Sequence, residues 1–303
     1  MTRIVLAYSG GLEATAAIPW LAETYGAEVM TLTLDIGQGL DLAHIRERAL
    51  AAGAVRAHVL DAREEFVRGF ILPALHAGAF SPDCEFAGIA LSRPLIAKRL
   101  VDMARMESAG AVAHGCACDA VDRQRLEGAV HAIDPGLDIM APLCTWGMSS
   151  AQVAEYSRAR NIVVGPAPAR DVDANVWGRV IHGSMAPGDY RLTRAVPDAP
   201  ATAAVMNIEF DGGAPVRANG VEMPLIEMIE SIETIAGAHG VGRLPGPGGS
   251  VAESPAAVVL HSAQSELSRA RQDSDDAAQV ISGTVRVRLF KGACEATALE
   301  SVA

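Results

Sequence analysis

Residues 3–21, RIVLAYSGGLEATAAIPWL, decide the fold of this chain. The apolar run RIVLAY is typical of a short buried strand, and the residues that follow the glycines carry the pattern of a helix ending at Gly26. Ser9, Gly10 and Gly11 allow backbone N–H groups to approach an anion, which the dipole of the following helix also favours. The stretch lacks the Gly-Lys-Ser/Thr ending of a Walker A loop. It predicts a phosphate-binding turn, with a plain strand-to-helix turn as the alternative.

Strands and helices alternate after this stretch. Residues 28–37, 55–62 and 111–115 have the apolar runs of buried strands, residues 41–53 have a helical pattern, and residues 64–109 are mostly helical in pattern. This alternation predicts a parallel sheet with helices on both faces, and such sheets bind ligands at the carboxyl ends of their strands. The motifs AYSGG, LDIGQG and AHGCA all lie at predicted carboxyl ends.

A different pattern begins near residue 166. Residues 204–223 predict a hairpin around a Gly-Gly turn, residues 224–240 an amphipathic helix, and residues 282–292 a strand of alternating polarity. We therefore expect an α/β nucleotide-binding domain over residues 1–165 and a smaller, shortened α+β domain over residues 166–303.

The composition argues against several classes of protein. Half of the 303 residues are hydrophobic, enough for a sizeable core, and the sequence has no apolar run of the length of about 18 residues that a membrane span needs. The formal net charge of −11 argues against a nucleic-acid partner, because phosphate binding needs clustered Lys and Arg. The N-terminus runs directly into the first predicted strand, which leaves no room for a signal peptide. Five scattered cysteines argue against a disulfide framework, so we expect a cytoplasmic protein.

Several motifs occur in one order along nearly the whole chain. They are AYSGGLEATAAIPWL, LDIGQG, LSRPLIAKRL, AHGC with DRQRLE, NVWGR, IAGAHGVGR and SGTVRVRLFKG. Together they resemble the argininosuccinate synthase family. The resemblance implies the N-type ATP pyrophosphatase fold, which is adenine nucleotide alpha hydrolase-like. In that family a ureido oxygen attacks the α-phosphate of ATP, pyrophosphate leaves, and the amine of aspartate then displaces AMP.

The resemblance implies that ATP is bound with Mg²⁺. The family has Asp-Thr-Ser where this chain has Glu13, Ala14 and Thr15, so Glu13 retains a carboxylate for Mg²⁺ and Thr15 retains a hydroxyl donor. The expected ATP-binding residues are Ala7, Tyr8, Ser9, Gly10, Gly11, Glu13, Thr15, Leu34, His114, Gly115 and Cys116.

The residues that hold aspartate in the family are mostly replaced here. Its Thr, Asn and Asp match Ala117, Val121 and Asp122, so the carboxylate alone is retained. Asp119 stands where the family has Lys, which makes the pocket more negative. Like charges in a partly buried pocket repel, so a dicarboxylate is disfavoured as the amine donor.

The citrulline pocket is altered as well. The family's Tyr matches Glu85, and three of its serines match Ala90, Asp171 and Val180, whereas Arg125 is retained. A site built on buried hydrogen bonds rejects its ligand once the partners are missing, so we do not expect argininosuccinate as the product. The expected substrate-binding residues are Glu85, Arg93, Asp119, Asp122, Arg125, Glu127 and Asp171, with Asp122 and Arg125 as the catalytic pair.

The phosphate motifs are retained while the residues specific for both substrates are replaced, a pattern that favours a retargeted ligase over a decayed one. We expect it to adenylate a carbonyl- or ureido-type oxygen of a small acceptor, to join that acceptor to an amine, and to belong to specialised metabolism. The expected assembly is a homo-oligomer, dimer or tetramer, with no nucleic-acid or membrane partner. Three alternatives remain open: a carrier protein that presents the acceptor, a non-catalytic nucleotide-binding relative, and a sulfur-inserting variant that uses Cys118.

Overall fold

The computed structural model describes residues 2–78, 87–116, 121–162, 172–183, 185–246, 249–272 and 282–299. The chain forms two compact units, Met1–Ala62 with Ala90–Ala169 and Arg63–Ile89 with Arg170–Ala303. Residues 63–89 group with the second unit because α4 (Leu72–His76) packs against α10 (Pro255–Gln272), although the expected boundary at residue 165 assigns them to the first domain.

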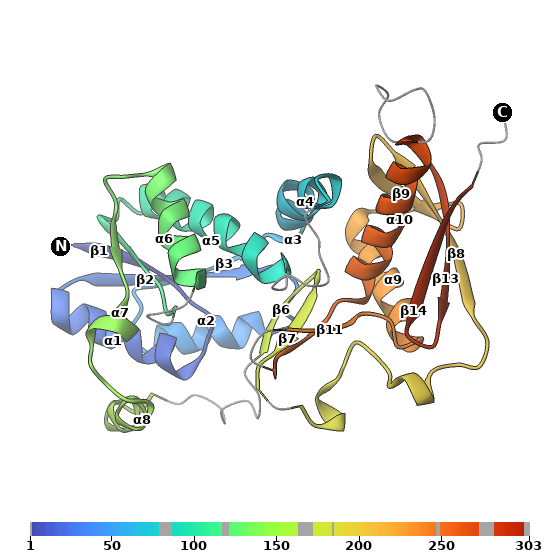
Figure 1. Cartoon of the computed structure of the whole chain (residues 1–303). Coiled ribbons are helices and arrows are strands. Elements are labelled where there is room, and N and C mark those ends of the chain that lie inside the picture. Colours follow the sequence, from blue (N-terminus) through green and yellow to red (C-terminus); the bar gives the residue numbers. More distant parts are fainter. Residues whose placement is uncertain are drawn as a thin grey trace. The chain divides into compact units, whose positions relative to one another are not determined.

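The first unit is built on a five-stranded sheet in which every neighbouring pair is parallel (Figure 1). The strand order is β3 (Arg56–Asp61), β2 (Glu28–Asp35), β1 (Arg3–Ala7), β4 (Ala111–Ala113) and β5 (Asp138–Met140). Helices cover both faces, as the alternating pattern predicts. They are α1 (Leu12–Tyr25), α2 (Leu42–Ala51), α5 (Ala87–Met106), α6 (Val121–Ile133), α7 (Pro142–Thr145) and α8 (Ser150–Ala159).

The second unit contains two antiparallel sheets and the helices α9 (Leu225–Ala238) and α10, which pack against each other. One sheet has the order β10 (Val221–Glu222), β9 (Ala214–Ala218), β8 (Ala204–Asp211), β13 (Gly283–Phe290) and β14 (Ala293–Leu299). The other has the order β11 (Arg243–Pro245), β12 (Val251–Glu253), β7 (Gly178–Ile181) and β6 (Val172–Asn175). Short helical segments complete this unit: α3 (Arg63–Phe66), the π-helix Val67–Ile71, and 3-10 turns at Pro187–Asp189 and Val196–Asp198.

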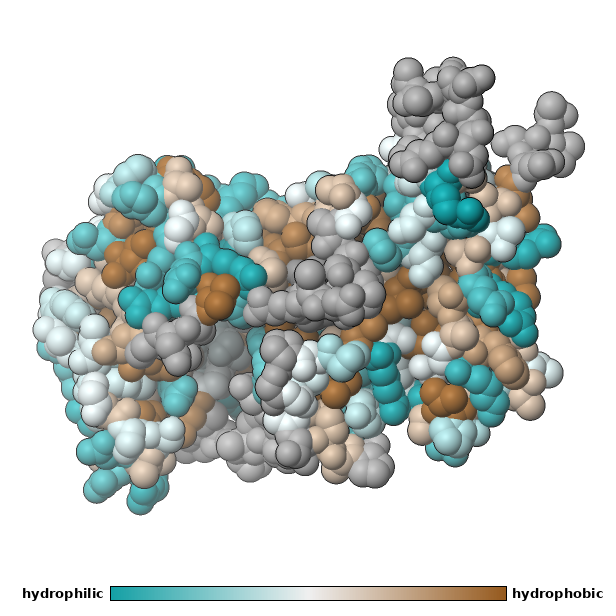
Figure 2. All heavy atoms as spheres, in the orientation of Figure 1, coloured by the Kyte–Doolittle hydropathy of each residue, from teal (hydrophilic) through white to brown (hydrophobic). Residues whose placement is uncertain are grey.

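No helix in the described ranges is long and apolar enough to cross a membrane. On the face that Figure 2 shows, hydrophilic and hydrophobic residues are interspersed. Among the described residues, the buried hydrophobic side chains come from the strands and helices of both units.

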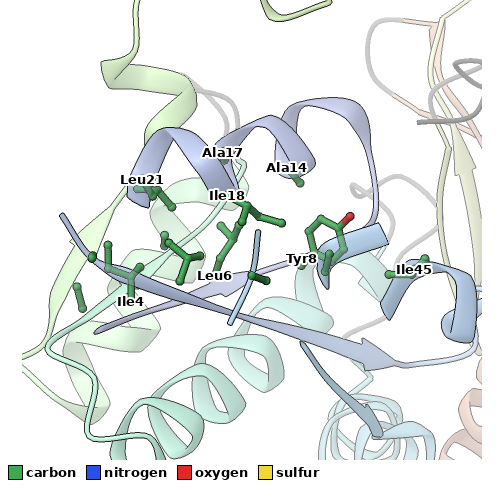
Figure 3. Close-up of a cluster of buried hydrophobic side chains, with 14 residues drawn as sticks. Ile4, Leu6, Tyr8, Ala14, Ala17, Ile18, Leu21 and Ile45 are labelled. Carbon is green, nitrogen blue, oxygen red and sulfur yellow. The ribbon is translucent and has the colours of Figure 1, made fainter. Parts of the chain in front are cut away.

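The core of the first unit lies between β1 and α1 (Figure 3). Ile4 and Leu6 point from β1 toward Ile18 and Leu21 of α1, and all four side chains are fully buried. Each such side chain contributes roughly 1.5–3 kcal/mol on burial. Alanines at positions facing the sheet allow the helix to approach closely, so the start of α1 is held firmly against the end of β1.

A buried carboxylate organises the second unit. Glu253 is fully buried and accepts hydrogen bonds from the backbone N–H groups of Arg191, Leu192 and Thr193 at 2.9–3.1 Å. The hydroxyl of Thr193 and the guanidinium of Arg179 also donate to it, at 2.6 and 3.0 Å. A buried charge is tolerated when it is paired and fully hydrogen-bonded, so Glu253 fixes the course of residues 191–193.

Glu233 on α9 is a carboxyl group whose environment opposes its charge. Burial, with smaller contributions from the charges of Glu230 and Glu253, raises the pKa of Glu233 to about 7. In the unfolded chain this carboxyl has its ordinary pKa of 4.5, whereas in the folded chain the pKa is about 7. The free energy of unfolding therefore falls as the pH rises across this window.

We expect Glu233→Gln to be more stable than the wild type at about pH 8, by on the order of 2 kcal/mol after allowance for solvent screening, and equal to it near pH 4. Urea unfolding of both proteins across this range measures the difference. Glu227→Gln, an exposed position on the same helix, is the control and should follow the wild type. Parallel curves for Glu233→Gln and the wild type would contradict the prediction.

Candidate functional site

Three neighbouring strands end at the same edge of the parallel sheet. β1 ends at Ala7 and lies between β2, which ends at Asp35, and β4, which ends at Ala113. The chain runs from β1 to β2 on one side and reaches β4 on the other, so the strand order reverses at β1. Ligands bind in the crevice that such a reversal opens at the carboxyl ends.

The glycine turn after β1 presents the start of α1. Gly10 adopts a left-handed φ of +82°, and Gly11 is the N-cap, with no side chain capping the helix there. Ser9, Gly11 and Glu13 are exposed, whereas Gly10 is buried against Ile45 of α2. The first N–H groups of an α-helix have no partner within it and carry its positive dipole end, so this turn suits a phosphate group.

Side chains beneath the turn hold its shape. The hydroxyl of Thr33 donates to the carbonyl of Tyr8 at 2.9 Å, and the hydroxyl of Thr15 donates to the carbonyl of Gly11 at 2.7 Å. Tyr8 Oη lies 2.9 Å from Thr15 Oγ1, and since the single proton of Thr15 is already donated, Tyr8 is the donor. Burial raises the pKa of Tyr8, which keeps this donor protonated.

Thr15 has a structural role in this turn, and its contact with ATP stays a prediction. Its side chain is fully buried and its proton points to Gly11, so it shapes the turn. A hydroxyl one helical turn after a glycine bonds readily to the carbonyl four residues earlier.

The turn after β2 is closed by Gln38, a residue that the sequence analysis did not single out. Its amide donates to the carbonyl of Leu34 at 2.6 Å and accepts from the N–H of Ile36 at 2.7 Å. Asp35 accepts from the N–H of Gly37 at 2.9 Å. Leu34 and Ile36 are buried, and the hydrogen bonds of Gln38 and Asp35 hold the turn between them.

His114, at the end of β4, lies inside the unit with 2% of its surface exposed. Nδ1 accepts from the N–H of Cys116 at 3.3 Å, so the proton is on Nε2, which lies 3.1 Å from a carboxylate oxygen of Glu127. Burial lowers the pKa of His114, and the bond to Glu127 opposes this only in part. Burial alone would raise the pKa of Glu127, but the bonds from Arg123 and His114 outweigh it and lower that pKa.

His114 is consequently a neutral ring with both nitrogens engaged. The ring supports the chain at Gly115 and Cys116 from inside the unit, and its role in ATP binding stays a prediction. Gly115 is exposed, and its backbone is the part of this turn that faces solvent.

Asp122 lies between two guanidinium groups. Arg93 of α5 donates to one carboxylate oxygen at 3.0 Å, and Arg125 of α6 donates to the other at 3.2 Å. All three side chains are partly buried, with 18–34% of their surface exposed. The carboxylate of Asp122 is therefore held by charge-assisted hydrogen bonds from two different helices.

Some expected residues lie outside the described ranges. Among the described cysteines, Cys144 is disulfide-bonded, although the scattered cysteines argue against a disulfide framework. In the described ranges, no group of three or more His, Cys, Asp or Glu side chains is arranged to hold a metal ion. The predicted site residues outside the described ranges are Glu85, Asp119 and Asp171. The replaced position Ala117 and the alternative nucleophile Cys118 also lie outside them.

The parallel sheet, the glycine turn and the helix after it define an ATP pyrophosphatase-type nucleotide-binding protein. Residues 3–163 match the arginosuccinate synthase N-terminal HUP domain, and residues 171–277 match the arginosuccinate synthase C-terminal domain. The chain belongs to the argininosuccinate synthase family, and this membership assigns it to the ATP-dependent C–N ligases.

Relatives cover most of the chain. An argininosuccinate synthase from Listeria innocua is 40% identical over 286 residues, which are 88% of this chain and 70% of the relative. One from Symbiobacterium thermophilum is 37% identical over 343 aligned positions, which are 96% of this chain and 86% of the relative. Among solved structures, a 4-thiouridine synthetase–RNA complex with bound ATP covers 53% of this chain at 14% identity, with a TM-score of 0.38.

The neutral state of His114 predicts a pH dependence of stability. In the unfolded chain the imidazole titrates with an ordinary pKa of about 6.5, whereas the buried ring has a lower pKa. As the pH falls, the unfolded chain takes up the proton first, so the free energy of unfolding of the wild type falls. His114→Gln does not titrate and retains an amide donor.

We expect the free energy of unfolding of the wild type to fall more steeply than that of His114→Gln below about pH 6.5, by at most about 1.4 kcal/mol per pH unit. Urea unfolding at stepped pH measures both slopes. His131→Gln, at an exposed position on the same helix as Glu127, should retain the wild-type slope. Equal slopes for His114→Gln and the wild type would show that the ring is not buried neutral.

Proposed function

We propose that this chain is an AMP-forming ligase that joins an amine to a small acceptor other than citrulline, using an amine other than aspartate. The observation that carries the proposal is the contrast between the two parts of the site. The Ser-Gly-Gly turn and the helix start after it are present, although Glu13, Ala14 and Thr15 replace the family's Asp-Thr-Ser, whereas most of the side chains that the resemblance assigns to citrulline and aspartate are replaced.

The phosphate part is made mostly of backbone. The exposed N–H groups at Gly11 and the first turn of α1, with the hydroxyl of Ser9, are the donors proposed for the polyphosphate of ATP. Leu34, Gly115 and Cys116 border the same edge of the sheet and are proposed to contact the rest of the nucleotide. Ala7 and Tyr8 bring the chain into this turn.

Glu13 fits a role in holding Mg²⁺. It is exposed in the first turn of α1, directly after the phosphate turn. Mg²⁺ is usually held by one or two carboxylates together with substrate phosphates, so a single protein carboxylate is sufficient. The ion would neutralise charge on the phosphates of ATP.

The substrate part is proposed to use Arg125 and Asp122. Arg125 binds a carboxylate of the acceptor, Asp122 orients the amine or accepts its proton, and Arg93 holds Asp122 in place. Glu127 supports this region through His114 and Arg123, and Glu85, Asp119 and Asp171 are proposed substrate contacts as well.

Two of the positions where this chain differs from the family in its substrate residues are Val121 and Val180, both in the described ranges. Val121 begins α6 with 51% of its surface exposed, and this apolar group stands where the family has an amide. Val180, in the second unit, is 5% exposed in β7, where a buried methyl group replaces a hydroxyl. Neither side chain donates or accepts a hydrogen bond, so the polar contacts of the original ligands cannot form there.

The proposed reaction balances in two steps. The acceptor oxygen bonds to the α-phosphorus of ATP, and pyrophosphate leaves with the electrons of the broken P–O bond. The amine nitrogen then bonds to the activated carbon, AMP leaves with the original acceptor oxygen, and the amine proton passes to a base. Acceptor, amine and ATP thus give the ligated product, AMP and pyrophosphate.

The setting of this reaction is also a proposal. Changed specificity on a retained adenylating scaffold suits specialised metabolism, with a small-molecule acceptor that is free or held on a carrier protein. Like the family, the chain is proposed to act as a cytoplasmic homo-oligomer, dimer or tetramer, without nucleic-acid or membrane partners.

The test is pyrophosphate release from Mg²⁺-ATP by the full chain, with ureido, amide and carboxylate acceptors offered with and without amines. Acceptors labelled with ¹⁸O at the reacting oxygen should transfer the label to AMP. Turnover with another pair, and none with citrulline plus aspartate, supports the proposal. Brisk turnover of citrulline plus aspartate would overturn the change of substrates, and ATP binding without turnover across the panel would favour the non-catalytic alternative.

Once an acceptor is known, Arg125→Met should raise its KM by about 10- to 100-fold and leave the KM for ATP unchanged, because a charge-assisted bidentate contact is lost. Steady-state kinetics with each substrate varied measures the split. Gln124→Met, at an exposed neighbouring position on α6, is the control. An equal rise in both KM values would assign Arg125 to the fold instead of the acceptor.

A further inference from the structure

The fold brings Arg48 of α2 to the phosphate turn. Its Nη1 donates to the carbonyl of Gly10 at 2.5 Å, across 38 residues of sequence. Ile45, one turn earlier on the same helix, packs so closely on Gly10 that a Cβ atom there would lie 2.9 Å from its Cγ1. One face of α2 therefore supports the turn through an apolar contact and a charged hydrogen bond.

The hydrogen bond from Arg48 fixes the orientation of the next N–H group. The peptide between Gly10 and Gly11 is planar and trans, so its carbonyl and its N–H point in opposite directions. With the carbonyl directed to Arg48, the N–H of Gly11 is directed away from α2. Gly11 is exposed and is the N-cap of α1, so this N–H belongs to the phosphate-binding set.

Arg48 also supplies charge that the turn itself lacks. Residues 7–15, AYSGGLEAT, contain no Lys or Arg, whereas Glu13 adds a negative charge. Burial raises the pKa of Tyr8, and the positive charge of Arg48 lowers it by a smaller amount. Among the described residues, none accepts a hydrogen bond from the buried Nε of Arg48. A partly buried cation beside a phosphate site acts through a lower dielectric than water, which strengthens its attraction.

We infer that Arg48 is a positioning residue for the pyrophosphate portion of ATP, which it serves by orienting the peptide between Gly10 and Gly11 and by placing a positive charge beneath the turn. The inference rests on the proposed function, because it takes the turn to be the polyphosphate site. Arg48 acts on the β- and γ-phosphates, so the affinities for ATP and pyrophosphate depend on it and the affinity for AMP does not.

Equilibrium binding by the full chain tests this without knowledge of the acceptor. The ligands are Mg²⁺-ATP, Mg²⁺-pyrophosphate and AMP, measured by calorimetry for the wild type, Arg48→Met and Arg48→Lys. Arg48→Met should bind ATP and pyrophosphate about 10- to 100-fold more weakly and AMP within about 2-fold of the wild type. Arg48→Lys retains the charge without the planar fork, so its loss should be smaller.

Arg46→Met is the matched control. Arg46 lies on the same helix, is exposed, and donates to the carbonyl of Ala57 at 3.3 Å, so its loss should leave all three affinities unchanged. Thermal unfolding of each variant reports on folding, and Arg48→Lys provides the measurement if Arg48→Met does not fold.

Equal weakening for AMP and ATP would overturn the inference, since a collapsed turn weakens every nucleotide alike. Unchanged binding of ATP and pyrophosphate in Arg48→Met would overturn it as well, and so would a wild type that binds neither ligand. Failure of the proposed ligase activity is a separate result, because it leaves the dependence of ATP and pyrophosphate binding on Arg48 intact.

Discussion

The close packing of α2 against Gly10 is the constraint on which the nucleotide site depends. Gly10 is left-handed, buried under Ile45 and bonded through its carbonyl to Arg48, so the turn has one backbone course. That course directs the chain into α1, whose buried face packs on β1 and carries the core of the first unit. The same geometry leaves Gly11 at the exposed helix start, so folding and phosphate binding rest on one arrangement.

The two parts of the site respond differently to substitution because they are built differently. The phosphate turn offers backbone N–H groups, and the side chains that shape it, Tyr8, Thr15 and Thr33, lie beneath the surface. The proposed substrate part depends on side chains, among them Asp122 and Arg125, which are bonded to each other. Replacing side chains there changes the preferred ligand while the backbone donors stay in place. A family scaffold can thus retain its use of ATP when its substrates change.

The second unit shows how a buried charge can organise a chain. Glu253 accepts hydrogen bonds from three backbone N–H groups, a hydroxyl and Arg179. These bonds fix the position of the segment from Arg191 to Thr193. Burial raises the pKa of Glu233, and the charges of Glu230 and Glu253 add smaller contributions, so its proton is retained to a higher pH. Neither glutamate could be identified from the sequence, because a glutamate usually indicates a solvent-exposed position.

The sequence by itself determined the parallel sheet and the glycine turn ahead of α1, because alternating apolar segments and a strand–Gly–Gly–helix stretch are local patterns. The family followed from the resemblance of several motifs that occur in one order along the chain. The sequence also indicated the hairpin at the Gly-Gly turn of the second unit. Only the tertiary structure decided which polar side chains face inward. Thr15 and His114 form hydrogen bonds inside the first unit, and Arg48 and Gln38 hold the turns after β1 and β2. The physical reason is that burial and hydrogen-bond partners arise from segments far apart in sequence. Arg48 meets Gly10 across 38 residues, and no local pattern encodes that contact.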